Sequence, residues 1–97
     1  MTYADIVNEA PLVLVEFFAT WCPHCRRMMP VVDQVKELLG PDVPVVQLDI
    51  DQNQEPANEA SVNGVPTFII YRGGQEVWRH SGEIDGNDLL ARVQSYQ

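Results

Sequence analysis

Positively charged residues are scarce in this sequence. Only 6 of its 97 residues are Lys or Arg, against 14 Asp or Glu, and the formal net charge is -8 at pH 7. Such a surface repels phosphate backbones and anionic lipid headgroups, and no cluster of Lys or Arg forms a local basic patch. We therefore expect no nucleic-acid partner and no membrane partner, and we interpret the charge as a source of solubility.

Long apolar runs are also missing. A helix that crosses a bilayer needs about 20 apolar residues, whereas the longest apolar run here, residues 11–15, stops at Glu16. The first residues lack the basic segment and the apolar segment of a secretory signal. We expect a cytoplasmic protein, or an exported one if a signal has been removed.

Internal repeats and low-complexity segments are not found either. The length is sufficient for one small hydrophobic core and insufficient for a second. We therefore expect a single domain over residues 1–97, and we expect it to act as a monomer.

The spacing of apolar residues predicts three main helices. Helical spacing is found over residues 2–10, 23–39 and 85–96, and a short helix or turn is expected at 53–60. Pro30 lies inside the longest of these helices and removes one backbone donor, so it predicts a kink there.

Apolar runs rich in β-branched and aromatic residues predict the strands. They lie at residues 12–18, 43–50, 67–71 and 77–81. The first two should be parallel because a long helix separates them, and Gly73-Gly74 should join the last two as an antiparallel hairpin. The result is an α/β fold, a mixed sheet of about four strands flanked by helices.

The only two cysteines lie in the run Trp21-Cys22-Pro23-His24-Cys25, between the first strand and the long helix. If Cys22 is the N-cap and Pro23 the first helical residue, the free amide of Cys25 points towards the Cys22 sulfur. The helix N-terminus favours negative charge, so the pKa of Cys22 should fall. Redox chemistry is the favoured interpretation of such a pair beside a βαβ unit.

Two other interpretations of the cysteine pair remain open. As a structural staple it would contribute only about 2 kcal/mol, because the closed loop is so short. A zinc site needs four ligands, and His24 and His80 do not provide the spacing. We therefore expect no metal.

Three sets of residues resemble the motifs of the thioredoxin family. They are residues 15–25 with the Cys22-Pro23-His24-Cys25 run, residues 64–68 with Gly64-Val65-Pro66-Thr67-Phe68, and the glycines Gly73, Gly74 and Gly82. The resemblance covers nearly the whole chain and implies a thioredoxin fold from which the opening strand is missing. It also implies protein-disulfide substrates, a thioredoxin reductase or similar electron donor, and no cofactor beyond a Cys22–Cys25 disulfide.

The resemblance also implies roles for residues near the cysteines. Val65-Pro66 would be a cis peptide against the disulfide, with the Val65 backbone pairing with an extended substrate. Trp21 would cover the sulfurs and touch the substrate, and Gly82 would also belong to the substrate-binding residues. The alternatives are a trans proline at a strand edge and a tryptophan that belongs to the core.

Glu16 is the one charge in an apolar strand, where ionisation is costly. Burial should raise its pKa and let it exchange a proton with Cys25. Thioredoxins usually carry Asp at this position, and Glu reaches one methylene further. The alternative is that Glu16 turns towards solvent.

The dipeptide between the cysteines departs from the usual Gly-Pro. Pro23-His24 resembles the oxidising DsbA type, whose reduced form is stabilised. An imidazolium at His24 would stabilise the Cys22 thiolate and ease reduction of the disulfide, whereas a His24 that merely faces solvent would not.

We therefore predict a protein thiol-disulfide oxidoreductase that reduces protein disulfides. Cys22 attacks, Cys25 resolves the mixed disulfide, and Glu16 receives the Cys25 proton. One alternative is an oxidase or isomerase tuned by Pro23-His24. Another is a non-catalytic peptide-binding module.

Overall fold

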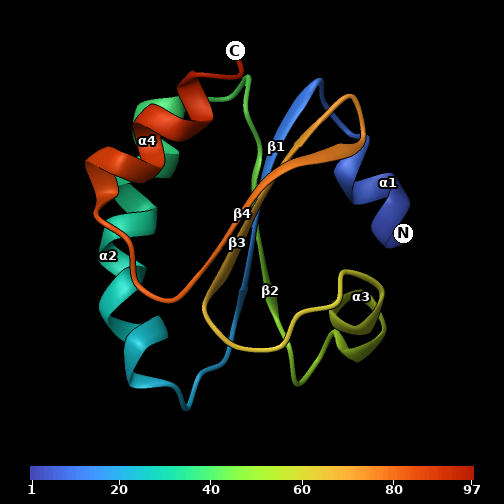
Figure 1. Ribbon diagram of the computed structural model, residues 1–97, viewed down its shortest axis with the longest axis vertical. Coiled ribbons are helices and arrows are strands. Elements are labelled where there is room, and N and C mark those ends of the chain that lie inside the picture. Colours follow the sequence, from blue (N-terminus) through green and yellow to red (C-terminus); the bar gives the residue numbers. More distant parts are fainter.

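A four-stranded mixed sheet runs through the middle of the molecule (Figure 1). Its strands are β1 (Leu12–Phe18), β2 (Val45–Asp49), β3 (Thr67–Arg72) and β4 (Gln75–Ser81), in the spatial order β2-β1-β3-β4. β2 is parallel to β1, while β3 is antiparallel to both β1 and β4. The computed structural model describes all residues, 1–97.

Helices cover both faces of this sheet. Figure 1 shows α2 (Pro23–Leu39) and α4 (Gly86–Gln94) on one side, and α1 (Tyr3–Val7) and α3 (Gln54–Glu59) on the other. α2 is the crossover that makes β1 and β2 parallel. The predicted α/β fold, with four mixed strands between helices, is confirmed. No helix has the length and apolar character needed to cross a membrane.

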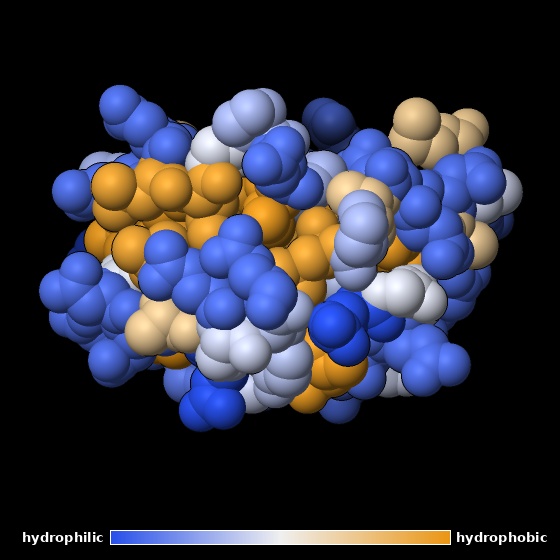
Figure 2. Space-filling view, turned by 90° about the horizontal axis from the view of Figure 1, so that it is seen from above, coloured by the Kyte–Doolittle hydropathy of each residue, from blue (hydrophilic) through white to orange (hydrophobic).

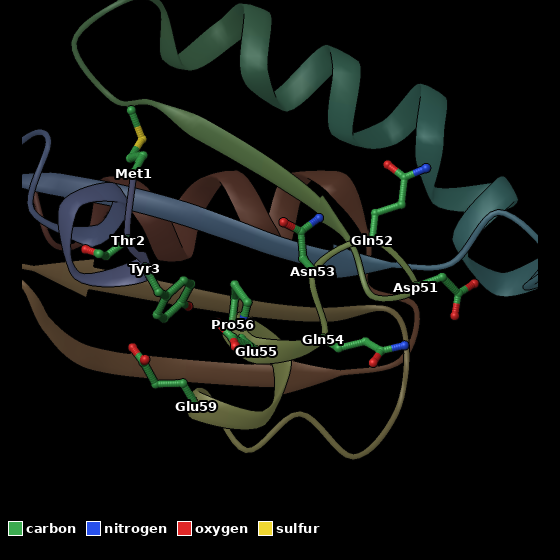
Figure 3. Close-up of a pocket in the computed structure, with 10 residues that line it drawn as sticks. All are labelled: Met1, Thr2, Tyr3, Asp51, Gln52, Asn53, Gln54, Glu55, Pro56 and Glu59. Carbon is green, nitrogen blue, oxygen red and sulfur yellow. The ribbon is translucent and has the colours of Figure 1, made fainter.

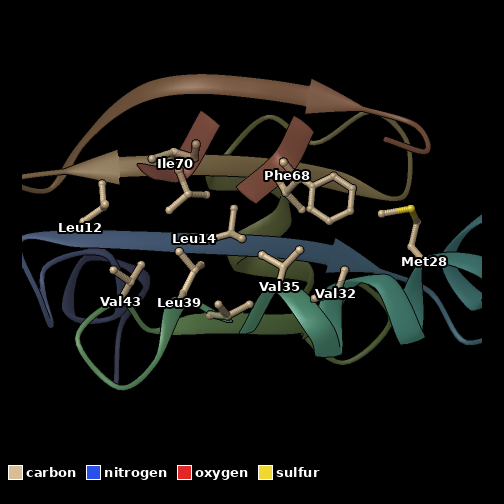
Figure 4. Packing of buried hydrophobic residues seen from close by; sticks show 12 residues of the cluster. Leu12, Leu14, Met28, Val32, Val35, Leu39, Val43, Phe68 and Ile70 are labelled. Atoms are coloured by element: carbon tan, nitrogen blue, oxygen red, sulfur yellow. The ribbon is translucent and has the colours of Figure 1, made fainter. Parts of the chain in front are cut away.

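Alternation along β1 separates two apolar layers. Leu12 and Leu14 face α2 and α4, where they join residues such as Phe68 and Ile70 (Figure 4). Val13 and Val15 point the other way, into the cluster that α1 and α3 cover. β1 is therefore buried on both sides, as its continuous apolar run predicts. Seen from above, an apolar band bordered by hydrophilic side chains reaches the surface (Figure 2).

The first helix is shorter than the predicted segment 2–10. Thr2 caps it, since its hydroxyl accepts from the N–H of Asp5 and the Asp5 carboxylate accepts from the N–H of Thr2. The helix ends at Val7 because the Asn8 side chain donates to the carbonyl of Ala4 at 2.8 Å and turns the chain.

The long helix and the hairpin follow the prediction more closely. Cys22 is the N-cap of α2 and Pro23 its first residue, and the helix continues through Pro30. The kink at Pro30 stays a prediction. Gly73 and Gly74 link β3 to β4 with φ values of 59° and 79°, the left-handed backbone that a tight hairpin requires.

We expect Ile70→Val to lower the free energy of unfolding by about 1 kcal/mol, because Ile70 is fully buried and the change removes one methylene. Leu38 is 59% exposed, and we expect Leu38→Ala to change the free energy by less than about 0.5 kcal/mol. Urea unfolding of both variants measures the difference. Equal losses would contradict the packing described for the α2 side of the sheet.

Candidate active site

The cysteine pair lies where β1 ends and α2 begins. The backbone turns after Phe18, and the N–H of Cys22 donates to the carbonyl of Ala19 at 3.2 Å. The carboxyl ends of the parallel strands β1 and β2 meet at the same edge of the sheet, which brings Ile50 and Asp51 beside Trp21. Both cysteines are free thiols.

The N-terminus of α2 makes Cys22 acidic. The backbone N–H of Cys25 lowers the pKa of Cys22 most, and the Cys25 thiol, the N–H of His24 and the charge of Arg27 lower it further, while burial opposes them. These donors are free because an α-helix leaves its first N–H groups without partners. A thiolate at Cys22 is therefore stabilised, as the position of the pair predicts.

Cys25 has the opposite character. Both side chains are nearly buried, Cys22 at 5% and Cys25 at 2% exposed, but Cys25 lies one turn into α2 and does not line the hollow beside Cys22 described below. Burial raises the pKa of Cys25 to about 11, and the nearby charges of Cys22 and Glu16 raise it as well. One helical turn thus holds a thiol that ionises readily and a thiol that keeps its proton.

Glu16 is buried, so the alternative that it turns to solvent is wrong. It is 2% exposed and shares the α2-facing side of β1 with Leu14. Burial raises the pKa of Glu16, the charge of Asp33 raises it further, and a hydrogen bond from Gln47 opposes both. Gln47 Nε2 donates to Glu16 Oε1 at 3.0 Å, across the register pair between β1 and β2.

A hollow of about 520 Å³ opens beside Cys22. Trp21 forms part of its wall and is 61% exposed, and its indole N–H donates to Asp51 at 2.9 Å. Val65 forms another part, and its carbonyl lies 3.7 Å from the Cys22 sulfur. The hollow therefore gives a substrate access to one of the two sulfurs.

The Val65-Pro66 peptide bond is cis, as the resemblance implies. The carbonyl of Pro66 accepts from the N–H of Gly82 at 2.8 Å, so the two segments lie side by side. Gly82 adopts a φ of 99°, which a residue with a side chain rarely takes. The residues singled out in the sequence at 21–25, 65–66 and 82 thus meet at one end of the molecule.

A larger hollow, of about 720 Å³, lies between the start of α1 and α3 (Figure 3). Its walls are mostly polar and acidic, and no thiol lines it. Asp51 and Gln54 line both hollows. We place the chemistry at the smaller hollow, because only there does a reactive sulfur form part of the wall.

His24 faces outwards from the first turn of α2 and meets a residue that the sequence analysis did not single out. Its Nδ1 lies 2.7 Å from Oε2 of Glu83, which also binds Arg27. Pro23 is the first residue of α2. No three His, Cys, Asp or Glu side chains converge in a way that could bind a metal ion.

The sequence analysis missed four residues of this site: Arg27, Gln47, Asp51 and Glu83. Asp51 could have been found because it follows a strand parallel to β1, where side chains meet at the sheet edge. Glu83 directly follows Gly82, which was singled out. Gln47 and Arg27 carry no signal of their own in a single sequence.

Comparison with known proteins agrees with this geometry. The Thioredoxin family profile matches residues 1–95. The chain is 37% identical over 95 residues to the thioredoxin of Chlamydia trachomatis, covering 98% of this chain and 91% of that protein. It is 38% identical over 88 residues to Thioredoxin Y, chloroplastic, of Oryza sativa, covering 91% of this chain and 52% of that protein.

Solved structures give the same result. The thioredoxin of Fasciola hepatica superposes with a TM-score of 0.85 at 35% identity, over 96% of this chain and 89% of that one. Members of this family work on disulfide substrates with a reductase as partner, and they need no cofactor beyond their redox-active cysteines. The chain spans about half the length of the rice protein and most of the length of the chlamydial one. It belongs to the thioredoxin family of protein-disulfide oxidoreductases.

Proposed function

We propose that the chain reduces protein disulfides, with Cys22 as the attacking group. The Cys22 thiolate attacks one sulfur of a substrate disulfide, so that a Cys22–substrate bond forms and the substrate S–S bond breaks. The other substrate sulfur leaves as a thiolate. Cys25 then attacks the Cys22 sulfur, which releases the second substrate thiol and leaves a Cys22–Cys25 disulfide. Two electrons pass from the protein to the substrate.

Glu16 receives the proton that Cys25 must lose in the second step. A buried carboxylate with a raised pKa is suited to accept a proton from a buried thiol. The charge of Glu16 acts on Cys25, which supports this pairing. Gln47 holds one carboxylate oxygen and leaves the other without a hydrogen bond from the protein.

Trp21, Val65, Pro66 and Gly82 bind the substrate. An extended substrate segment would pair with the backbone of Val65 next to Cys22 and lie in the hollow beside Trp21. Such pairing uses backbone hydrogen bonds and therefore accepts many sequences. The Trp21 indole is fixed by Asp51 and offers a flat apolar face.

The observation that carries the proposal is the opposite character of the two thiols. A lowered pKa at Cys22 and a raised pKa at Cys25 give one nucleophile and one protected resolving group within a single helical turn. A structural staple needs no such difference. A binding module does not need it either.

A thioredoxin reductase or similar donor returns the disulfide to the dithiol. The chain is 39% identical over 80 residues to part of the bifunctional thioredoxin reductase/thioredoxin of Mycobacterium leprae, a protein in which the two are joined. We propose that residues 1–97 act as one monomeric domain with no further cofactor and no nucleic-acid or membrane partner. Bacterial relatives support the cytoplasm as its compartment, and chloroplast relatives support the chloroplast.

Pro23-His24 supports a second candidate, an oxidase or isomerase. We expect the reduction potential to exceed the value of about -270 mV for thioredoxin by no more than about 60 mV, because each pKa unit of thiolate stabilisation corresponds to about 30 mV. Titration against glutathione measures it. A potential near about -180 mV would favour an isomerase, and one near about -120 mV an oxidase.

The matched control for this titration is the double variant Pro23→Gly, His24→Pro. We expect its potential to fall towards that of an ordinary thioredoxin. If the double variant keeps the potential and the pKa of Cys22 unchanged, Pro23 and His24 do not tune the site.

A further inference from the structure

Glu83 is bound to two positively charged or chargeable side chains of α2 through a single oxygen. Its Oε2 accepts hydrogen bonds from Nε and Nη2 of Arg27 at 3.0 and 2.8 Å, and it lies 2.7 Å from Nδ1 of His24. The same Nδ1 also lies 2.9 Å from Nη2 of Arg27, so each of the three side chains contacts the other two. The three side chains form a cluster beside the redox pair, at the first two turns of α2.

This cluster joins two segments that are far apart in the sequence. Glu83 lies in the loop between β4 and α4, directly after Gly82, and His24 lies between the two cysteines. The loop is held a second time, because the N–H of Gly82 donates to the carbonyl of Pro66. Glu83 therefore ties the loop that contains Gly82 to the start of the helix that follows Cys22.

The cluster also controls charge near the reactive sulfur. The backbone N–H of Cys25 lowers the pKa of Cys22 most, and the charge of Arg27 adds a smaller contribution in the same direction. Glu83 pairs with Arg27 and offsets part of that charge. Arg27 and His24 together lower the pKa of Glu83 to about 2, so Glu83 is ionised at neutral pH. Arg26, the next positive side chain along α2, has no acidic partner and donates to the carbonyl of Trp21 at 3.4 Å.

We propose that Glu83 is a positioning residue for thiol-disulfide exchange: it anchors His24 and Arg27 beside Cys22 and limits the positive charge that acts on the thiolate. The consequence is a redox pair that is less oxidising than its Pro23-His24 dipeptide alone would make it. This inference rests on the proposed function, in which Cys22 is the attacking group.

The test is the rate at which Cys22 is alkylated in Glu83→Gln. The amide keeps an acceptor oxygen for Arg27 and His24 but removes the negative charge. The rate follows the thiolate fraction until Cys22 is fully ionised. On the rising part of the rate-pH profile, at low salt, we therefore expect an increase of about two- to fivefold, the size of an exposed charge interaction. Iodoacetamide is the reagent because it is neutral and Arg27 does not attract it.

Three further variants identify the cause of the increase. Glu76→Gln is the matched control, since Glu76 also pairs with an arginine, Arg79 on β4, and the net charge changes equally; we expect no change in rate. In an Arg27→Gln background the effect of Glu83→Gln should shrink. Glu83→Ala, which also removes the anchor, should accelerate alkylation less than Glu83→Gln. Raising the salt concentration to 1 M should reduce all of these differences.

Two results would overturn the inference. One is an alkylation rate in Glu83→Gln that equals the rate in the wild type or in Glu76→Gln. The other is an unchanged reduction potential, which we expect to move towards more oxidising values in Glu83→Gln. Mass spectrometry of the wild type separates this failure from failure of the proposed function. If iodoacetamide labels Cys25 as fast as Cys22, the assignment of Cys22 as the attacking thiol is wrong.

Discussion

Replacing Cys25 with Ser will leave the protein covalently attached to its disulfide substrates. The Cys22 thiolate of this variant still attacks, because the backbone N–H groups at the start of α2 that stabilise it remain in place. Ser cannot displace the substrate thiol from the mixed disulfide. An intramolecular attack held within one helical turn has a very high effective concentration, so we expect release to slow by roughly a thousandfold or more.

Non-reducing gels followed by mass spectrometry will detect these complexes, and dithiothreitol should release them. Cys22→Ser is the matched control, since it removes the other sulfur of the same pair; we expect neither complexes nor disulfide reduction. If Cys22→Ser keeps the biological function of the chain, the thiols are incidental. The alternative of a non-catalytic peptide-binding module would then hold.

Glu16→Gln will slow the second step of the reaction far more than the first. The variant keeps a side chain of the same shape on β1 but removes the group that accepts the Cys25 proton. General acid-base catalysis of such a step contributes about a hundredfold or more. Rapid-mixing experiments with a model disulfide separate the two steps, because formation of the mixed disulfide depends on Cys22 and its resolution on Cys25.

Gln47→Leu is the companion variant, because it keeps Glu16 and removes the hydrogen bond that opposes the rise in its pKa. As the pH is lowered, Glu16 becomes protonated and can no longer accept the Cys25 proton. We expect the resolution rate of this variant to begin to fall at a higher pH than in the wild type. If both steps in Glu16→Gln run at the wild-type rate, Glu16 takes no part in the reaction.

The same carboxyl makes stability depend on pH. Burial raises the pKa of Glu16 above the ordinary value of 4.5, so the folded state binds this proton more tightly than the unfolded state does. The contribution of Glu16 to the free energy of unfolding is fully present at a pH below its ordinary pKa. It is lost as the pH rises through the pKa of Glu16 in the folded state. At neutral pH, Glu16→Gln should therefore be more stable than the wild type, and the difference should vanish in acid.

Much of the fold could be predicted because its signals are local. The apolar run of β1 indicates burial on both faces, and Pro23 after Cys22 indicates where a helix begins. The end of α1 was wrong by three residues. The helical spacing continues to Ala10, but a hydrogen bond from the Asn8 side chain to the backbone ends the helix earlier.

The site was only partly predictable, for a related reason. The cysteine pair and Glu16 stand out because a thiol motif and a charge in an apolar run are unusual in themselves. Gln47 and Glu83 are ordinary polar residues whose importance comes from partners 31 and 59 positions away in the chain. Such pairings depend on strand register and on the path of a loop, and neither can be derived from one sequence.

The two sides of the hollow beside Cys22 differ in how easily they can open. Cys22 follows β1, which lies between the two apolar layers and pairs with a strand on each side, so this part of the chain opens only with the whole fold. The opposite wall includes α3, a six-residue helix with one buried side chain, Ala57. Local opening at α3 costs far less, so the recognition surface can adapt to different partners while the reacting sulfur stays in place.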